Sequence, residues 1–176
     1  MVRVFALAAA VLALLPAVAS AHGPSRQKVT ETVEINAPAD KVWEVIGDFQ
    51  DMSWHPAVAK TEGEGGNEAK ATRVLTLGSG GVINETLLKY DPEKKMYKYE
   101  ISDVDVKVLP VNNYSSMLSV TGEGDKSTVT WKGAFYRGFM NNDPPPELND
   151  EAAKKAVTDV YRSGLDGLKK KIEAGG

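Results

Sequence analysis

The last stretch of the chain, Asn149 to Glu173, constrains the fold most, because it predicts a long helix with one apolar face. Apolar or small residues recur there every three or four positions, at Ala153, Val157, Val160, Tyr161, Gly164, Leu165, Leu168 and Ile172. Asn149 or Asp150 is suited to cap the first turn, and lysines gather near the last turn, where the helix dipole favours positive charge. An amphipathic helix of this length must cover an apolar surface elsewhere in the chain.

Two glycines, Gly164 and Gly167, interrupt this otherwise favourable helix. Each costs about 1 kcal/mol relative to alanine in a helix interior. Two interpretations remain open. Either the glycines allow close packing against a neighbouring segment, or the missing side chains leave room for something beside the helix.

Residues 1–21 have the pattern of a signal peptide. An apolar run from Val4 to Val18 is followed by Ala19-Ser20-Ala21, which has the small-x-small pattern of a signal-peptidase site. The run is too short to span a membrane as a helix. We therefore expect cleavage before His22, with cleavage after Ala19 as the alternative, a periplasmic location, and no membrane insertion of the mature chain.

The mature chain has the length of one domain, with a flexible leader at 22–26 and the folded part at 27–176. Cysteine is absent, so packing alone must hold an exported protein together. Removal of Arg3 leaves 20 basic residues against 24 acidic ones, a net charge of −4. This charge argues against nucleic acid and against an anionic membrane surface as partners, but it permits a protein partner with a basic surface.

The middle of the chain predicts a sheet. Alternating apolar and polar residues predict six strands, at Lys28–Ile35, Ala71–Leu77, Gly81–Tyr90, Lys95–Ile101, Val111–Thr121 and Ser127–Arg137. Two short helices are expected after the first strand, one from Asn36–Asp40 onward and one within Asp48–Pro56, followed by a turn at Thr61–Asn67. Asn141–Pro146 reads as a stiff, extended linker to the final helix. The fold class is therefore α+β, with the long C-terminal helix on one face of a curved antiparallel sheet.

Strand alternation predicts a buried ion pair. If Gly78–Gly80 forms a three-residue hairpin loop, Arg73 lies opposite Glu85 and both side chains point to the apolar face. A buried charge is costly unless it is paired, so the predicted pairing supports the predicted register. The pair is either a polar group inside a cavity or a structural ion pair at the rim of the sheet.

The other strands turn large aromatic residues and hydroxyls toward the helix, including Tyr99, Tyr114, Ser116, Trp131 and Phe135. Mostly apolar walls with a few convergent polar groups are typical of a ligand pocket. The alternative is that each tyrosine places its ring in the core and its hydroxyl at the rim.

The order of elements and several motifs resemble the START-like polyketide cyclase/dehydrase superfamily. The motifs are Trp54-His55-Pro56, Glu85-Thr86-Leu87, Tyr97-Lys98-Tyr99, Leu109 to Tyr114 and Val129-Thr130-Trp131. The resemblance covers the whole mature chain and implies a helix-grip fold, a curved sheet wrapped around the last helix with a cavity between them. The signal peptide, the stretch Trp54 to Lys60 and the stretch from Gly133 through Pro144-Pro145-Pro146 to Asp150 are most similar to the MxaD-like proteins, exported accessory proteins of methanol oxidation.

The superfamily includes the plant abscisic-acid receptors, and similarity to them implies that His55, Glu85, Tyr99, Tyr114, Ser116 and Trp131 line the cavity. The receptors have a ligand-binding lysine at the position of His55 and a longer gating loop at Gly78–Gly81. Both differences argue against a carboxylate-clamping role. The full set of candidate cavity residues is Trp54, His55, Arg73, Glu85, Tyr99, Tyr114, Ser116, Trp131, Phe135 and Tyr161.

Signals for catalysis and cofactors are few. Only two histidines occur, His22 and His55, and no His/Cys/Asp cluster has metal-ligand spacing, so neither a metal nor another cofactor is expected. No P-loop, dinucleotide fingerprint or nucleophile elbow occurs. An enzyme would have to use His55 or Glu85 as general base, although Arg73 opposes a raised pKa at Glu85.

Three functions follow from these observations. The first is a periplasmic, non-enzymatic accessory protein that contacts methanol dehydrogenase or its cytochrome, as the resemblance implies, through Pro144–Pro146 or through the Trp54-His55-Pro56 loop. The second is a carrier or sensor of a small apolar ligand. The third is a cyclase- or dehydratase-like enzyme that uses His55 and Glu85.

Overall fold

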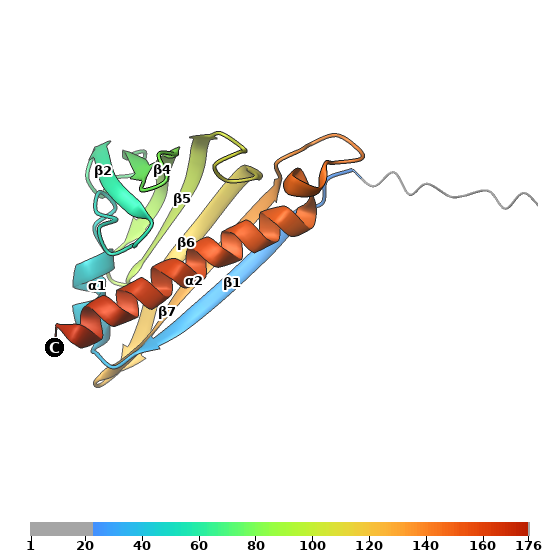
Figure 1. Ribbon diagram of the computed structural model, residues 1–176. Helices are drawn as coiled ribbons and strands as arrows, with labels where there is room; N and C mark the ends of the chain where they lie inside the picture. The colour runs from blue at the N-terminus through green and yellow to red at the C-terminus, as the bar shows by residue number, and fades with distance from the viewer. Residues whose placement is uncertain (1–22, 176) are drawn as a thin grey trace, which may run out of the picture.

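A single long helix, α2 (Asp150–Ala174), crosses one face of an antiparallel sheet (Figure 1). The structure is a computed structural model, and it describes residues 23–175. The expected signal peptide at 1–21 and the expected cleavage site before His22 therefore lie outside the described residues. Within the described part of the chain, no helix is long and apolar enough to cross a membrane.

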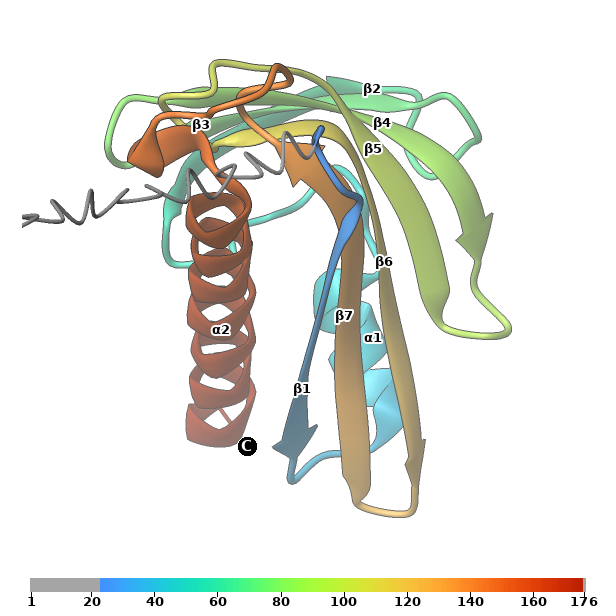
Figure 2. The ribbon, with the colours of Figure 1, turned by 90° about the vertical axis from the view of Figure 1, so that its right-hand side faces the viewer.

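The sheet has seven strands in the order β1-β7-β6-β5-β4-β3-β2, and every neighbouring pair is antiparallel. Figure 2 shows that it curves around α2, with the short helix α1 (Ala39–Ile46) on the same concave side. The core lies between this concave face and α2. The α+β class with a helix on one face of a curved sheet is thus confirmed. The strands are β1 (Gln27–Ile35), β2 (Val58–Glu64), β3 (Thr72–Leu77), β4 (Val82–Asp91), β5 (Met96–Val104), β6 (Val111–Glu123) and β7 (Lys126–Arg137).

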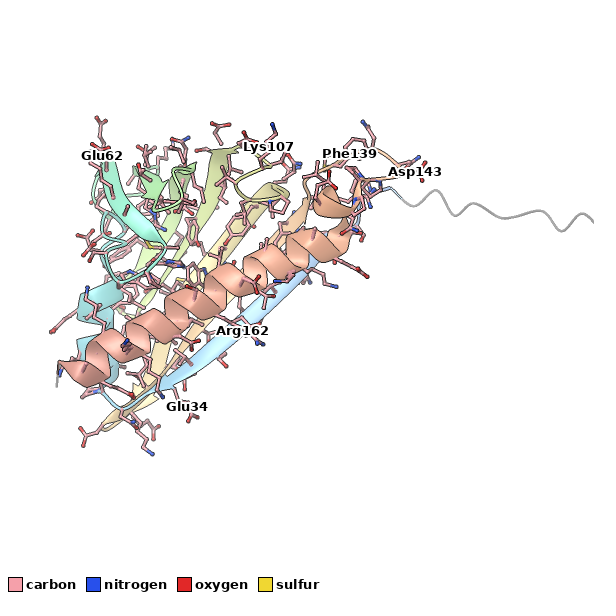
Figure 3. All side chains as sticks on the ribbon, in the orientation of Figure 1. Glu34, Glu62, Lys107, Phe139, Asp143 and Arg162 are labelled. Carbon is pink, nitrogen blue, oxygen red and sulfur yellow. The ribbon has the colours of Figure 1, made fainter. Side chains whose placement is uncertain are left out.

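Helix α2 follows the apolar pattern of its sequence. The Asn149 side chain caps the first turn, where its Oδ1 accepts a hydrogen bond of 2.8 Å from the Ala152 main-chain N–H. The residues of the predicted apolar face are buried, except that Val160 is half-buried: Ala153, Val157, Tyr161, Gly164, Leu165, Leu168 and Ile172. On the other side of the helix, Arg162 forms an ion pair of 3.1 Å with Glu31 of β1 (Figure 3).

Strand β2 is the element that the sequence analysis missed, because it expected a turn at Thr61–Asn67. This strand is an edge strand paired only with β3, and most of its side chains are exposed. The sequence of β2 therefore lacks the alternation of apolar and polar residues that predicts a strand. Its Gly63 lies so close to the Thr72 carbonyl and the Gln50 side chain that a Cβ atom would collide with both.

The second short helix expected within Asp48–Pro56 is also wrong, since this segment consists of turns. Asp48 and Asp51 each accept a hydrogen bond from the main-chain N–H two residues later, at 2.9 and 2.7 Å. Such aspartate turns compete with helix formation. The Gln50 side-chain amide then donates to main-chain carbonyls of the β2–β3 region, which fixes the segment against the sheet.

The end of this segment, Trp54-His55-Pro56, packs against the two glycines of α2, Gly164 and Gly167. A Cβ atom at position 164 would lie 2.5 Å from His55 Cδ2, and one at position 167 would lie 2.7 Å from Pro56 Cδ. Both glycines therefore allow close packing of a neighbouring segment. The space beside the helix is occupied by the Trp54-His55-Pro56 turn.

The connection from β7 to α2 is less extended than expected, because the Arg137 side chain binds main-chain carbonyls of this connection. The Arg137 guanidinium donates to the carbonyls of Phe139 and Asn141, at 2.8 and 2.9 Å. A short 3₁₀ helix at Pro146–Leu148 then leads into α2. Figure 3 places Phe139 and Asp143 in this loop, at the opposite end of α2 from the C-terminus.

Replacement of Gly164 by alanine is expected to destabilise the protein, although alanine favours helix. The added methyl group would also lie 2.8 Å from Trp131 Cζ3. Overpacking costs about 1–3 kcal/mol, which exceeds the gain of about 1 kcal/mol in helix propensity. Urea denaturation should show a lower free energy of unfolding for Gly164→Ala. The matched control is Ser163→Ala at the neighbouring exposed position, which should change stability by no more than about 0.5 kcal/mol. A Gly164→Ala variant more stable than wild type would contradict the packing argument.

Candidate functional site

The concave face brings all the predicted site residues into one buried cluster. Strands β3 to β7 contribute most of them, α2 contributes Tyr161, and the turn before β2 contributes Trp54 and His55. Burial of Trp54 and His55 agrees with their expected place among the cavity residues and argues against their other expected role, contact with a protein partner. The buried set is Trp54, His55, Arg73, Glu85, Tyr99, Tyr114, Ser116, Trp131, Phe135 and Tyr161.

Arg73 and Glu85 form an ion pair inside the core. The two residues are direct partners across β3 and β4. The Leu77 N–H donates to the Gly81 carbonyl at 2.8 Å, so the hairpin loop is Gly78–Gly80, as predicted. Arg73 Nε donates to Glu85 Oε2 at 2.6 Å, and the two residues are only 1% and 5% exposed. The pair therefore lies in the core and not at the rim of the sheet.

Aromatic rings complete the surroundings of the guanidinium. Arg73 Nη1 donates to the Phe49 carbonyl at 2.8 Å, and Arg73 Cζ lies 4.2 Å from the centre of the Phe49 ring and 5.1 Å from that of Tyr99. Cation–π contacts of this kind are stronger when water is excluded. The role of Phe49 could not be predicted, because nothing in the sequence places its main-chain carbonyl beside Arg73.

Burial acts differently on the pKa values of the two members of the ion pair. Burial acts to lower the pKa of Arg73, but the contacts with Glu85 and the neighbouring tyrosines raise it overall, so the guanidinium stays charged. At Glu85, burial is the largest influence and raises the pKa, while Arg73 opposes that rise. A carboxylate held in this way is a poor general base, because abstraction of a proton would leave Arg73 buried without its counter-ion.

A second polar system, the hydroxyl network, consists of Tyr99, Tyr114, Ser116, Tyr161 and the indole of Trp131. Trp131 Nε1 donates to Tyr99 Oη and to Ser116 Oγ, each at 3.0 Å. Tyr161 Oη lies 2.9 Å from Ser116 Oγ and 2.5 Å from Tyr114 Oη. The Tyr161 ring also stacks on Trp131, with ring centres 4.4 Å apart. The network therefore joins β5, β6 and β7 to α2.

The donors and acceptors of the hydroxyl network can be assigned by counting hydrogens. Ser116 has a single hydroxyl hydrogen and donates it to the Lys132 carbonyl at 2.7 Å. Tyr161 must then donate to Ser116, and Tyr114 must donate to Tyr161. Each hydroxyl hydrogen assigned in this way is used inside the protein, and Ser116 Oγ already accepts from Trp131 as well as from Tyr161.

Burial raises the pKa values of Tyr99 and Tyr114 well above their ordinary value, and burial also raises that of Tyr161. The network thus stays neutral across the physiological range. Gly133 makes this arrangement possible, because a Cβ atom there would collide with Tyr161 Oη.

Both ring nitrogens of His55 are engaged. Nε2 lies 3.0 Å from the Val160 carbonyl of α2, and Nδ1 accepts a hydrogen bond of 3.2 Å from the Ala57 main-chain N–H. These partners require the neutral tautomer with the hydrogen on Nε2. Burial lowers the pKa of His55, against the opposing effect of its hydrogen bond to Val160. Neither nitrogen is free to act on a substrate in this arrangement.

The space that remains inside the protein is a cavity of about 80 Å³. His55, Glu85, Tyr99, Tyr114 and Trp131 line it, together with apolar side chains. Ligand pockets generally measure about 300–1,000 Å³, so this cavity has room for a few waters or for a very small molecule. The remaining predicted residues lie outside its wall: Trp54, Arg73, Ser116, Phe135 and Tyr161. Within residues 23–175, no group of His, Cys, Asp and Glu side chains is arranged to hold a metal ion.

Removal of one member of the ion pair is expected to cost more than removal of both. Arg73→Met leaves the Glu85 carboxylate buried without its counter-ion, and such a change costs about 3–5 kcal/mol. The double variant Arg73→Met/Glu85→Leu replaces both charges by apolar groups and should recover most of that loss. Chemical denaturation of the wild type, both single variants and the double variant provides the test. Additive losses in the double variant would show that the two charges are not coupled.

Folding stability should also fall as the pH decreases below about 6.5, the ordinary pKa of histidine. The lowered pKa of His55 in the folded state means that the unfolded chain binds a proton first, so the contribution of His55 is complete above that pH and is lost below it. A chain that begins at Gly23 contains His55 as its only histidine, which makes the measurement specific. The difference between wild type and His55→Gln across pH 5–8 isolates this contribution, and parallel profiles for the two proteins would refute it.

Comparisons with known proteins agree with this architecture. An uncharacterized protein from Bacillus thuringiensis is 29% identical, with a TM-score of 0.70 over 83% of this chain and 98% of that chain. The protein XoxI from Bacillus cereus is also 29% identical, with a TM-score of 0.69 over 82% of this chain and 94% of that chain. The Zhui aromatase/cyclase from Streptomyces sp. R1128 is 17% identical, with a TM-score of 0.66 over 85% of this chain and 94% of that chain, so this likeness shows the fold alone.

No curated protein matches the sequence. One family model does match, over residues 26–173, which includes nearly all of the described residues. This chain therefore belongs to the polyketide cyclase/dehydrase and lipid transport family.

Proposed function

We propose that the protein is an exported, non-enzymatic accessory protein of methanol oxidation, which acts by contacting methanol dehydrogenase or the cytochrome that accepts its electrons. The motifs shared with MxaD-like proteins support this pathway. The similarity to a protein named XoxI, at 29% identity, points in the same direction. Family membership alone supplies a fold and not an activity, so the argument depends on the site.

The observation that carries the non-enzymatic part of the proposal is the hydroxyl network, in which the hydroxyl hydrogens of Ser116, Tyr114 and Tyr161 are all used inside the protein. An enzyme of this fold would need a hydroxyl or imidazole free to polarise or deprotonate its substrate. Here Ser116, Tyr114 and Tyr161 donate to one another or to the main chain, and both nitrogens of His55 are engaged. A cavity of about 80 Å³ also excludes a substrate as large as a polyketide. The interior thus supports stability, and the surface is left to perform the function.

The carrier of a small apolar ligand is the second candidate, and one observation favours it. The cavity walls are mostly apolar, and Glu85 lines the cavity while only its Oε2 has a hydrogen-bond partner among the described residues. A ligand of a few non-hydrogen atoms with one donor group would match this site. Native mass spectrometry of the purified protein tests this candidate, because a bound small molecule would appear as a fixed mass increment.

The test of the accessory role is direct binding to purified partners. Immobilised mature protein should retain purified methanol dehydrogenase or its cytochrome at an ionic strength of about 10 mM and retain less at about 150 mM, because salt screens contacts between exposed charges. Tyr114→Phe removes one hydroxyl of the network and serves as the interior variant. Its binding should equal that of the wild type if the function lies on the surface.

Two further outcomes bear on this proposal. Failure of the wild type to retain either protein at low salt would overturn it. Loss of binding in Asp143→Lys/Glu147→Lys would assign a contact to the exposed loop before α2, whereas unchanged binding would exclude the charges of this loop from the contact.

A further inference from the structure

The outer face of the sheet carries a groove of its own, separate from the inner cavity. Helices α1 and α2 both lie on the concave side, so the opposite face of β1, β7, β6 and β5 stays uncovered by the described residues (Figure 2). The groove measures about 370 Å³, several times the volume of the inner cavity. It crosses five neighbouring strands, from β1 to β4.

The floor of this groove is built from small and apolar residues. Gly133 and Ala134 of β7 and Ser115 of β6 lie at its base, and Met117 lies beside them. At the β4 end of the groove, the strand register shifts between Leu87 and Lys89.

This register shift identifies Leu88 as the extra residue of a β-bulge. Bulges redirect a side chain and are retained features of a fold. Leu88 lines the groove and is 47% exposed, one of the large apolar side chains turned to solvent in the described part of the chain. Leu88 therefore adds exposed apolar area to this end of the groove.

Three lysines, Lys28, Lys98 and Lys132, line the same groove. Within the described residues, none of the three forms an ion pair, although lysines on α2 and on β2 do so. The groove wall contains no carboxylate. Glu100 is exposed on the same face, where it is the cross-strand neighbour of Ser115, but it lies outside the wall. A protein of net charge −3 over its whole sequence thus concentrates unpaired positive charge at one apolar groove.

We propose that this groove docks an acidic segment of a protein partner, one that places an apolar side chain against Leu88 and Met117 and carboxylates against Lys28, Lys98 and Lys132. This inference rests on the proposed function, because it assigns the surface through which the accessory protein acts. Charge complementarity selects an acidic partner. The apolar floor selects a protein segment, and the absence of aromatic side chains from the groove wall removes the stacking platform that single-stranded nucleic acids need.

The test uses a defined probe, a Glu-rich peptide that contains leucine, and the same peptide with lysine in place of each glutamate. Titration of the ¹⁵N-labelled mature protein with the acidic peptide should shift the amide resonances of Leu88, Lys98, Met117 and Lys132 and leave those of α2 unchanged. The effect should weaken with added salt and should be absent with the basic peptide.

Charge reversal locates the site. Lys98→Glu/Lys132→Glu should weaken binding of the acidic peptide about tenfold, which corresponds to the loss of several exposed charge contacts. The matched control is Lys154→Glu/Lys170→Glu on the exposed side of α2, which changes the net charge equally. Binding by this control should stay within about twofold of wild type. All four lysines are exposed, so unchanged melting temperatures are expected and verify folding.

The possible outcomes distinguish a failure of the docking inference from a failure of the proposed function. If the acidic peptide shifts no resonance of the groove, or if both double variants weaken equally, the docking inference is wrong. If the peptide binds in the groove but neither methanol dehydrogenase nor its cytochrome binds the wild type, the proposed function is wrong and the groove remains. If a purified partner binds wild type and Lys98→Glu/Lys132→Glu equally well, the proposed function stands and this surface is excluded.

Discussion

The burial of Arg73 is the interaction on which the interior of this protein depends. A guanidinium cannot release its proton in a protein, so its charge must be met wherever it lies. Here Glu85 supplies a carboxylate, the Phe49 main chain supplies a carbonyl, and aromatic rings cover the remaining faces. The register of β3 and β4 and the position of the segment after α1 are therefore fixed by the same charge. Any shift of one of these elements would leave a buried charge without its partner, at a cost of several kcal/mol.

The hydroxyl network extends this constraint to the other half of the sheet. It joins strands β5, β6 and β7 to Tyr161 of α2, while His55 ties the segment before β2 to the Val160 carbonyl of the same helix. Each polar group in these contacts faces another polar group of the protein. A concave face with this many paired side chains has little volume left for a ligand, and at the cavity wall the second carboxylate oxygen of Glu85 is the hydrogen-bonding group named above that still has no partner among the described residues. The other polar side-chain atoms that could bind a ligand here already form hydrogen bonds that stabilise the fold.

Much of this arrangement could be predicted from the sequence, because its signals are local or periodic. The apolar stripe of α2 and the cross-strand pairing of Arg73 with Glu85 follow from spacing, and composition narrows the cap of α2 to Asn149 or Asp150. Strand β2 could not be predicted, since an exposed edge strand pairs through its main chain and shows no apolar alternation. The sequence also cannot distinguish the turns between Asp48 and Pro56 from a short helix, because aspartates that cap individual turns resemble the start of a helix in composition. The volume of the cavity could not be predicted from the sequence either. The same tyrosines would line an open pocket or fill it, and only their mutual distances distinguish the two.

The contrast between the two faces of the sheet is the strongest argument for a surface function. On the concave face, Arg73 is paired with Glu85, the hydroxyls of Tyr114, Ser116 and Tyr161 are bound to one another, and the cavity beside them is about 80 Å³. On the outer face, three lysines stand without carboxylate partners among the described residues, beside a leucine that a bulge turns to solvent. Unpaired charge and exposed apolar area each leave interaction energy unused in the isolated chain. A partner that meets both at once can gain specificity from the lysines and affinity from burial of the leucine. The inner face offers a smaller gain, because its cavity is only about 80 Å³ and a ligand larger than that would first have to break contacts that hold the fold together.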